Sequence, residues 1–215
     1  FSPLLPEGMK FIVSAPGGVL ENVTDLVGFE RLCLMIYEEE SLLQEIFNAV
    51  GSRLLRLYEK CLPYDSVGAL IINDDWGFKT QTMLDPDSMR KFVFPWHRLM
   101  VKASHRQGKP VIHHSCGNIY SMLDEIIETI GFDARHSFED VILPVEQAWQ
   151  DWGEKIAIMG GIDMNFLATS TPEEISKRAE NLLKMTRCKG YALGSGNSIP
   201  EFIPVENYLA MISVI

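Results

Sequence analysis

The chain has 215 residues, 47% of them apolar and 22% charged, which is the composition of a globular protein with a sizeable buried core. Its 29 acidic residues against 19 Lys and Arg give a formal net charge of -10, which argues against a surface for nucleic acid or an anionic membrane. No apolar run reaches the roughly 18 residues of a membrane-spanning helix, and the first residues lack the pattern of a signal peptide. The cysteines are widely spaced, which favours reduced thiols and a cytoplasmic location over a disulfide framework: Cys33, Cys61, Cys116 and Cys188.

Strand and helix patterns alternate along the first part of the chain. An apolar strand at 11–13 runs into a glycine turn, and a long amphipathic helix follows with apolar residues at helical spacing over 46–58. Ser41 and Gln44 have the spacing of a capping box at the start of this helix. The next strand is predicted at 69–72 and ends in a polar segment.

The middle of the chain continues this alternation. A helix is predicted to open at Asp85 and Pro86, which have the order of an N-cap followed by a first-turn proline. Pro95 is expected to kink this helix. A short buried strand at 109–113 and a helix over about 119–130 follow.

The last part of the chain completes a pattern of six strands. Short strands are expected to end near 135–137, 159–163 and 193–197, and Thr171 with Glu174 predicts a capped helix between the last two. Strands alternating with helices predict an α/β fold with a parallel sheet and right-handed crossovers. Six strands fit an open sheet, or a (β/α)8 TIM barrel whose N-terminal strands are missing from this chain. One domain over residues 1–215 is expected, since no linker or second composition appears.

Polar side chains follow the apolar runs at their carboxyl ends, where active sites of parallel α/β folds lie. If the sheet closes into a barrel, these residues converge on one mouth. The candidates are Asp74, Asp75, His114, Cys116, His136, Glu139, Asp163, Ser195 and Asn197.

His114 and Cys116 form the most informative pair. Side chains two apart on a strand point the same way, so the imidazole and the thiol share one face where the strand gives way to a loop. Zinc prefers such nitrogen and sulfur ligands, although a zinc site needs at least three protein ligands. The pair therefore predicts part of a metal site, and packed, unligated side chains are the alternative.

The other candidates have structural interpretations as well. Asp74 and Asp75 suit a general base or a substrate contact, and they also suit Asx hydrogen bonds that cap a turn. His136 is equally compatible with a metal ligand, a proton donor or a loop residue. Glu139 would by default be solvated, and His113 is expected to point into the helix layer in a structural role.

Several segments together resemble the uroporphyrinogen decarboxylase superfamily in order and spacing. They are 73–77 (Asn-Asp-Asp-Trp-Gly), 110–118 (ending in His-His-Ser-Cys-Gly-Asn), 160–163 (Gly-Gly-Ile-Asp), 194–197 (Gly-Ser-Gly-Asn) and 204–207 (Pro-Val-Glu-Asn). The resemblance covers nearly the whole chain, as the C-terminal two-thirds of such a protein. It implies a (β/α)8 barrel that begins upstream of this sequence.

Two chemistries of the superfamily are relevant. Its decarboxylases act on a tetrapyrrole of porphyrin metabolism without a cofactor, and carry a histidine in the last Leu-Gly-His-Gly turn. Its methyltransferases, such as methylcobalamin:coenzyme M methyltransferase, bind zinc through His-x-Cys and a later cysteine and move a methyl group between a corrinoid and a thiol. This sequence is similar to the methyltransferases at His114 and Cys116. It differs from both branches in the last turn, where it has Ser195 in place of the histidine of the decarboxylases and the cysteine of the methyltransferases. The third zinc ligand is left among His136, Glu139 and an upstream residue.

The resemblance therefore implies a zinc-dependent methyltransferase, with a decarboxylase (a carboxy-lyase) and a non-catalytic corrinoid- or tetrapyrrole-binding protein as alternatives. The metal ligands are His114 and Cys116; the candidate catalytic residues are Asp74, Asp75, His136 and Ser195; the candidate substrate-binding residues are Trp76, Glu139, Asp163 and Asn197. The expected partners are a small thiol or tetrapyrrole substrate and a corrinoid protein, with no nucleic acid and no membrane. The oligomeric state is left open, with a homodimer as one candidate.

Overall fold

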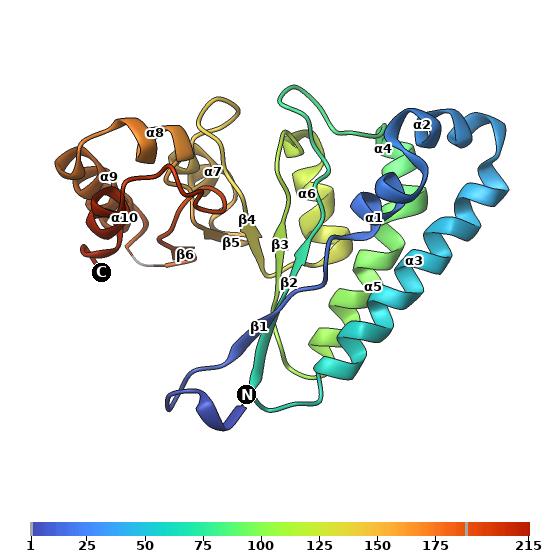
Figure 1. Cartoon of the computed structure of the whole chain (residues 1–215), viewed down its shortest axis with the longest axis horizontal. Helices are drawn as coiled ribbons and strands as arrows, with labels where there is room; N and C mark the ends of the chain where they lie inside the picture. Colours follow the sequence, from blue (N-terminus) through green and yellow to red (C-terminus); the bar gives the residue numbers. More distant parts are fainter. Residues whose placement is uncertain (1, 188) are drawn as a thin grey trace. The chain divides into compact units, whose positions relative to one another are not determined.

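The computed structural model describes residues 2–187 and 189–215 and shows parallel strands alternating with helices (Figure 1). The chain divides into two compact units, Phe1–Asp133 and Ala134–Ile215, and each is described by itself. Of the four cysteines, Cys188 lies outside the described residues, and Cys33, Cys61 and Cys116 are reduced.

The first unit is built on three parallel strands, β1 (Phe11–Val13), β2 (Val67–Asn73) and β3 (Val111–His114), in that order. All four residues of β3 are buried, as expected for a strand covered on both faces. Asn73 of β2 is in register with His114 of β3, so the carboxyl ends of these two strands are level. This register brings the polar segments that follow β2 and β3 next to each other.

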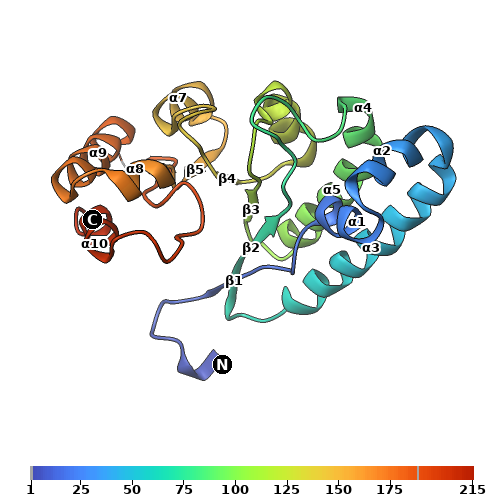
Figure 2. The ribbon, with the colours of Figure 1, turned by 45° about the horizontal axis from the view of Figure 1, so that its top comes forward.

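Helices cover the strands of the first unit on one side, where α1, α3 and α5 lie alongside one another (Figure 2). The ring of Phe47 on α3 stacks on that of Phe92 at 5.2 Å, which joins α3 to the short helical segment that precedes α5. The α-helices are α1 (Val19–Val27), α2 (Phe29–Glu38), α3 (Glu40–Cys61), α4 (Pro86–Ser88), α5 (Phe94–His105) and α6 (Leu123–Glu125). Shorter helical segments are the 3-10 turns η1 (Ser2–Leu4) and η3 (Tyr120–Met122), and the π-helical η2 (Met89–Val93) and η4 (Ile126–Ile130).

Local helix signals of the first unit were partly right. Asp85 caps α4 by accepting hydrogen bonds from the amides of Asp87 and Ser88, which confirms the predicted start. The predicted capping box at Ser41 is wrong, because α3 begins earlier, at Glu40, and has no side-chain cap. The expected single helix over 119–130 is instead split into η3, α6 and η4.

The second unit repeats the pattern with β4 (Ala134–His136), β5 (Ala157–Met159) and β6 (Tyr191–Ala192), parallel and in that order. Its helices are α7 (Val145–Trp152), α8 (Met164–Thr169), α9 (Pro172–Thr186) and α10 (Val205–Ile212). The predicted capping box of α9 is confirmed: the Thr171 side chain accepts from the Glu174 amide, and the Glu174 carboxylate accepts from the Thr171 amide. Among the described helices, none is both long and apolar enough to cross a membrane.

Candidate metal centre

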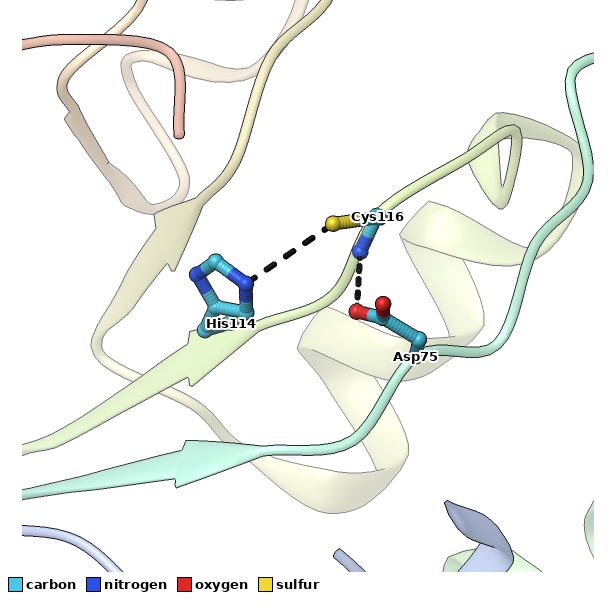
Figure 3. Close-up of side chains that lie close together, drawn as sticks. All are labelled: Asp75, His114 and Cys116. Carbon is cyan, nitrogen blue, oxygen red and sulfur yellow. Dashed lines mark hydrogen bonds between the residues drawn. The ribbon is translucent and has the colours of Figure 1, made fainter. Parts of the chain in front are cut away.

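Three side chains of the first unit converge at the carboxyl ends of β2 and β3 (Figure 3). His114 is the last residue of β3, Cys116 follows two residues later, and Asp75 follows the end of β2 by two residues. One ligand atom from each lies within 4.8 Å of the others, and Nε2 of His114 is 3.8 Å from Sγ of Cys116. The prediction that the imidazole and the thiol face the same space is confirmed.

The donor set fits a zinc ion. Zinc is bound by imidazole nitrogen, thiolate sulfur and carboxylate oxygen, and in a tetrahedral site a nitrogen and a sulfur ligand lie about 3.6 Å apart. The 3.8 Å between His114 and Cys116 is close to that separation. Asp75 is a candidate for the third ligand, a role that sequence reasoning had left to His136, Glu139 or an upstream residue. The adjacent Asp74 and Asp75 after β2 were the sequence signal for a carboxylate ligand. Their order in the sequence does not indicate which of the two faces the metal site.

Hydrogen bonds donated by two backbone amides join the loops that carry Asp75 and Cys116. The amide of Asp74 donates to the carbonyl oxygen of His114 at 3.0 Å, which extends the pairing of β2 and β3 by one step. The amide of Cys116 donates to Oδ1 of Asp75 at 2.7 Å. The carboxylate of Asp75 therefore contacts the ligand loop directly while remaining half-buried, as Cys116 is.

Asp74 has a structural role in capping α1, and its expected catalytic role stays a prediction. Its carboxylate is fully buried and accepts hydrogen bonds from the amides of Val19, Leu20 and Glu21, the first turn of α1, at 2.9–3.1 Å. Nε2 of His97 contacts the same carboxylate at 2.8 Å. Both oxygens of this carboxylate are thus engaged by protein groups in the interior. Asp74 therefore acts as a cap, as its structural interpretation predicted, but it caps α1, which precedes it in the sequence, and not the turn that follows it.

Burial sets the protonation of this pair. Desolvation lowers the pKa of His97 to about 3, so its ring is neutral near pH 7. Desolvation also raises the pKa of Asp74 to about 7, against hydrogen bonds from the first turn of α1 that favour the carboxylate. Sequence reasoning had assigned no role to His97, because a histidine on an amphipathic helix carries no sign of a buried partner.

Trp76 is also in the interior, and its assignment to substrate binding stays a prediction. Its side chain is fully buried, and its ring centroid lies 4.3 Å from that of His113, 4.7 Å from that of His97 and 5.5 Å from that of Phe94. The indole ring is thus packed among these aromatic side chains. His113 stacks on Phe132 at 4.5 Å, in the structural position that the strand's alternation predicted.

A pocket of about 780 Å³ opens beside Asp75 in the first unit. Glu21 and Asp25 of α1 line it together with Asn22 and Asn73. Within the described part of the chain, no Lys, Arg or His lines this pocket. The space next to the candidate metal ligands is therefore polar and acidic.

In the second unit, the predicted site residues His136, Ser195 and Asn197 make hydrogen bonds to the backbone. Nε2 of His136 lies 3.1 Å from the carbonyl oxygen of Ser195, so this nitrogen carries the hydrogen and donates a hydrogen bond to that oxygen. Burial lowers the pKa of His136, which keeps the ring neutral. The hydroxyl of Ser195 donates to the carbonyl of Asn197, and Oδ1 of Asn197 accepts from the amide of Ser198.

The remaining candidates of the second unit lie in the loop after β4 and at the start of α8. Asp163 caps α8 with one carboxylate oxygen and accepts the amide of Asp140 with the other. Asp140 is paired with Arg178, so this acidic segment is not simply solvated. Glu139 is half-buried, and its role in substrate binding stays a prediction.

Comparisons with solved structures support the fold class. The chain superposes on a methyltransferase from Methanosarcina mazei with a TM-score of 0.77 at 18% identity, over 99% of this chain and 59% of that one. Xylanase B from Clostridium stercorarium F9 is similar at a TM-score of 0.51 and 10% identity, over 83% and 70% of the two chains. Fold and site thus define part of a TIM barrel with a candidate metal centre after β2 and β3.

Sequence comparison supplies the family. The model of the uroporphyrinogen decarboxylase family matches residues 8–215, and the chain belongs to this family. It is 25% identical to the uroporphyrinogen decarboxylase of Solibacter usitatus over 188 residues, which are 87% of this chain and 52% of that protein. It is 30% identical to that of Koribacter versatilis over 129 residues, 58% of this chain and 34% of that protein. The chain thus spans about half or less of the length of these curated relatives.

Proposed function

We propose that this chain is a zinc-dependent methyltransferase that moves a methyl group between a corrinoid and a thiol. The convergence of His114, Cys116 and Asp75 carries the proposal, because these are three zinc-type ligands at the carboxyl end of a parallel sheet. A metal-free decarboxylase has no use for a thiol and an imidazole placed in this way.

The residues of the chain have distinct roles in this proposal. His114 and Cys116 bind the ion, and Asp75 supplies a carboxylate oxygen as third ligand while it accepts the Cys116 amide. A zinc ion bound there supplies the charge that stabilises a substrate thiol as its thiolate. The pocket beside Asp75 is large enough for a small substrate, since ligand sites typically measure roughly 300–1,000 Å³.

The charge of that pocket favours methyl transfer over tetrapyrrole decarboxylation. Glu21, Asp25 and Asp75 are its charged lining residues in the described part of the chain. A substrate with several carboxylates would meet like charges there, which weakens its binding. A thiol or a methyl donor without carboxylates meets no such repulsion.

A uroporphyrinogen decarboxylase is the second candidate, because the curated relatives carry that name. A protein that binds a corrinoid or tetrapyrrole without turnover is the third. The proposed methyltransferase works with a corrinoid protein or a free corrinoid such as methylcobalamin as methyl donor or acceptor. Neither alternative transfers a methyl group.

The first experiment measures zinc in the purified protein and in three variants, His114→Ala, Cys116→Ala and Asp75→Ala. We expect about one zinc per wild-type chain and a loss of most of it in all three variants, since a zinc site needs about three protein ligands. Cys61→Ala is the matched control, because Cys61 is a free thiol at the end of α3 and should leave the zinc content unchanged. Wild-type protein without zinc after reconstitution contradicts the proposal.

The second experiment separates the three functions. Methylcobalamin and a small thiol are incubated with the protein, and demethylation of the corrinoid is followed by its absorbance. Uroporphyrinogen is tested in parallel for loss of carboxylates. Methyl transfer that disappears in Cys116→Ala supports the proposal, decarboxylation that persists in Cys116→Ala supports the second candidate, and tight binding with neither reaction supports the third.

A further inference from the structure

Ser115 lies between the two strongest ligand candidates and is fully buried. Its hydroxyl oxygen accepts a hydrogen bond from the amide of Trp76 at 2.9 Å and donates to the carbonyl of Cys116 at 3.1 Å. One hydroxyl therefore joins the residue after Asp75 to the backbone of Cys116.

Together with the hydrogen bond between Asp75 and Cys116, these contacts tie the loop after β2 to the loop after β3. Asp75 accepts the amide of Cys116, and Ser115 accepts the amide of Trp76, so the two loops exchange hydrogen bonds in both directions. The neighbours of Asp75 on either side are both fully buried, since Asp74 caps α1 and Trp76 packs among aromatic rings. Of these three residues, only Asp75 lines the pocket.

We propose that Ser115 is a positioning residue of the metal centre: its hydroxyl fixes the loop of Asp75 against the loop of Cys116, so that all three ligands meet. The inference rests on the proposed metal site. Removing the hydroxyl leaves the buried amide of Trp76 without this acceptor, and the loop must shift to find another. The separation between the Asp75 carboxylate and the other two ligands then changes.

The test compares zinc affinity, measured by chelator competition, in wild type, Ser115→Ala and Ser104→Ala. Ser104 is the matched control: it is equally buried, in the same unit, and its hydroxyl donates to the carbonyl of Lys109, which precedes the amino end of β3. Ser115→Ala should weaken zinc binding about 10–100-fold, as outer partners of metal ligands typically do. Ser104→Ala should leave the affinity within about twofold of wild type, whatever its effect on stability.

A second measurement on the wild type does not depend on how the variants fold. Because coupling is reciprocal, zinc should slow hydrogen exchange of the Trp76 amide more than that of Leu70, whose amide bonds to the carbonyl of Pro110 within the sheet. Equal affinity of Ser115→Ala and wild type, or equal protection of the two amides, overturns the positioning role and leaves the metal site standing. A wild type that binds no zinc overturns both.

Discussion

Oδ2 of Asp74 lies 2.8 Å from Nε2 of His97, and both side chains are fully buried. The same carboxylate caps α1, which carries Glu21 and Asp25 of the pocket. One buried contact therefore connects α5, α1 and the end of β2.

Replacing Asp74 by alanine should destabilise the fold strongly. The change leaves three amides at the start of α1 and the ring of His97 without their acceptor, and we expect a loss of roughly 3 kcal/mol or more in the free energy of unfolding. Asp85→Ala is the control, because it removes an exposed cap of α4 and should cost about 1 kcal/mol. Urea unfolding measures both, and equal losses would contradict a special role for Asp74.

The pair should also have an unusual pH dependence. Between about pH 4 and 6.5 the unfolded chain carries a proton on His97, whereas the folded protein carries one on Asp74, whose pKa is raised to about 7. Both states bind one proton, so the pair contributes almost no slope to stability in this window. In the wild type, the contribution of Asp74 and His97 to the free energy of unfolding should therefore change little with pH in this window.

Single substitutions should reveal two opposite slopes. In Asp74→Asn, His97 remains and the unfolded state binds more protons, so stability should rise with pH up to about 6.5, by at most about 1.4 kcal/mol per pH unit. In His97→Gln, Asp74 remains protonated in the folded state, so stability should fall as pH rises from about 4 to 7. Urea titrations at pH 4.5, 5.5 and 6.5 measure the slopes, and slopes of the same sign would refute this protonation scheme.

Gly117 should be intolerant of any side chain. Its φ is +78°, and a Cβ there would lie 2.0 Å from the carbonyl oxygen of Gly77 on the neighbouring loop. Gly108 has φ +66° but no atom within 4 Å of an added Cβ. Gly108→Ala should therefore cost about 1 kcal/mol, and Gly117→Ala roughly 3 kcal/mol or more together with weakened zinc binding. Thermal unfolding and chelator competition check this contrast, which fails if the two variants behave alike.

Arg178 should be important within the second unit. Its guanidinium binds Asp140 at 2.5 Å and Glu146 at 2.9 Å, and its side chain is only 16% exposed. Arg178→Met should lose about 2 kcal/mol even in high salt, because two half-buried carboxylates are left facing each other. Lys184→Ala removes an exposed pair with Glu180 and should cost less than about 0.5 kcal/mol, a loss that salt abolishes. Unfolding at low and high ionic strength distinguishes the two.

The sequence alone predicted the features that depend on local geometry. The alternation of strands and helices follows from hydrophobic periodicity, and the caps at Asp85 and Thr171 follow from side chains that bond to amides two or three residues away. The common face of His114 and Cys116 follows from the two-residue period of a strand. None of these needs information about distant residues.

Tertiary structure decided what depends on neighbours far away in the sequence. Asp74 and Asp75 are chemically alike and adjacent, but only the first meets the amides of α1, more than 50 residues earlier, while the second meets Cys116. The register of β2 against β3 sets this difference, as does the packing of α1 and α5 that encloses Trp76. His114 and Cys116 could therefore be paired from local geometry, because a strand fixes the direction of its own side chains. Asp75 joins them only through tertiary structure, because a strand does not fix the position of a neighbouring loop.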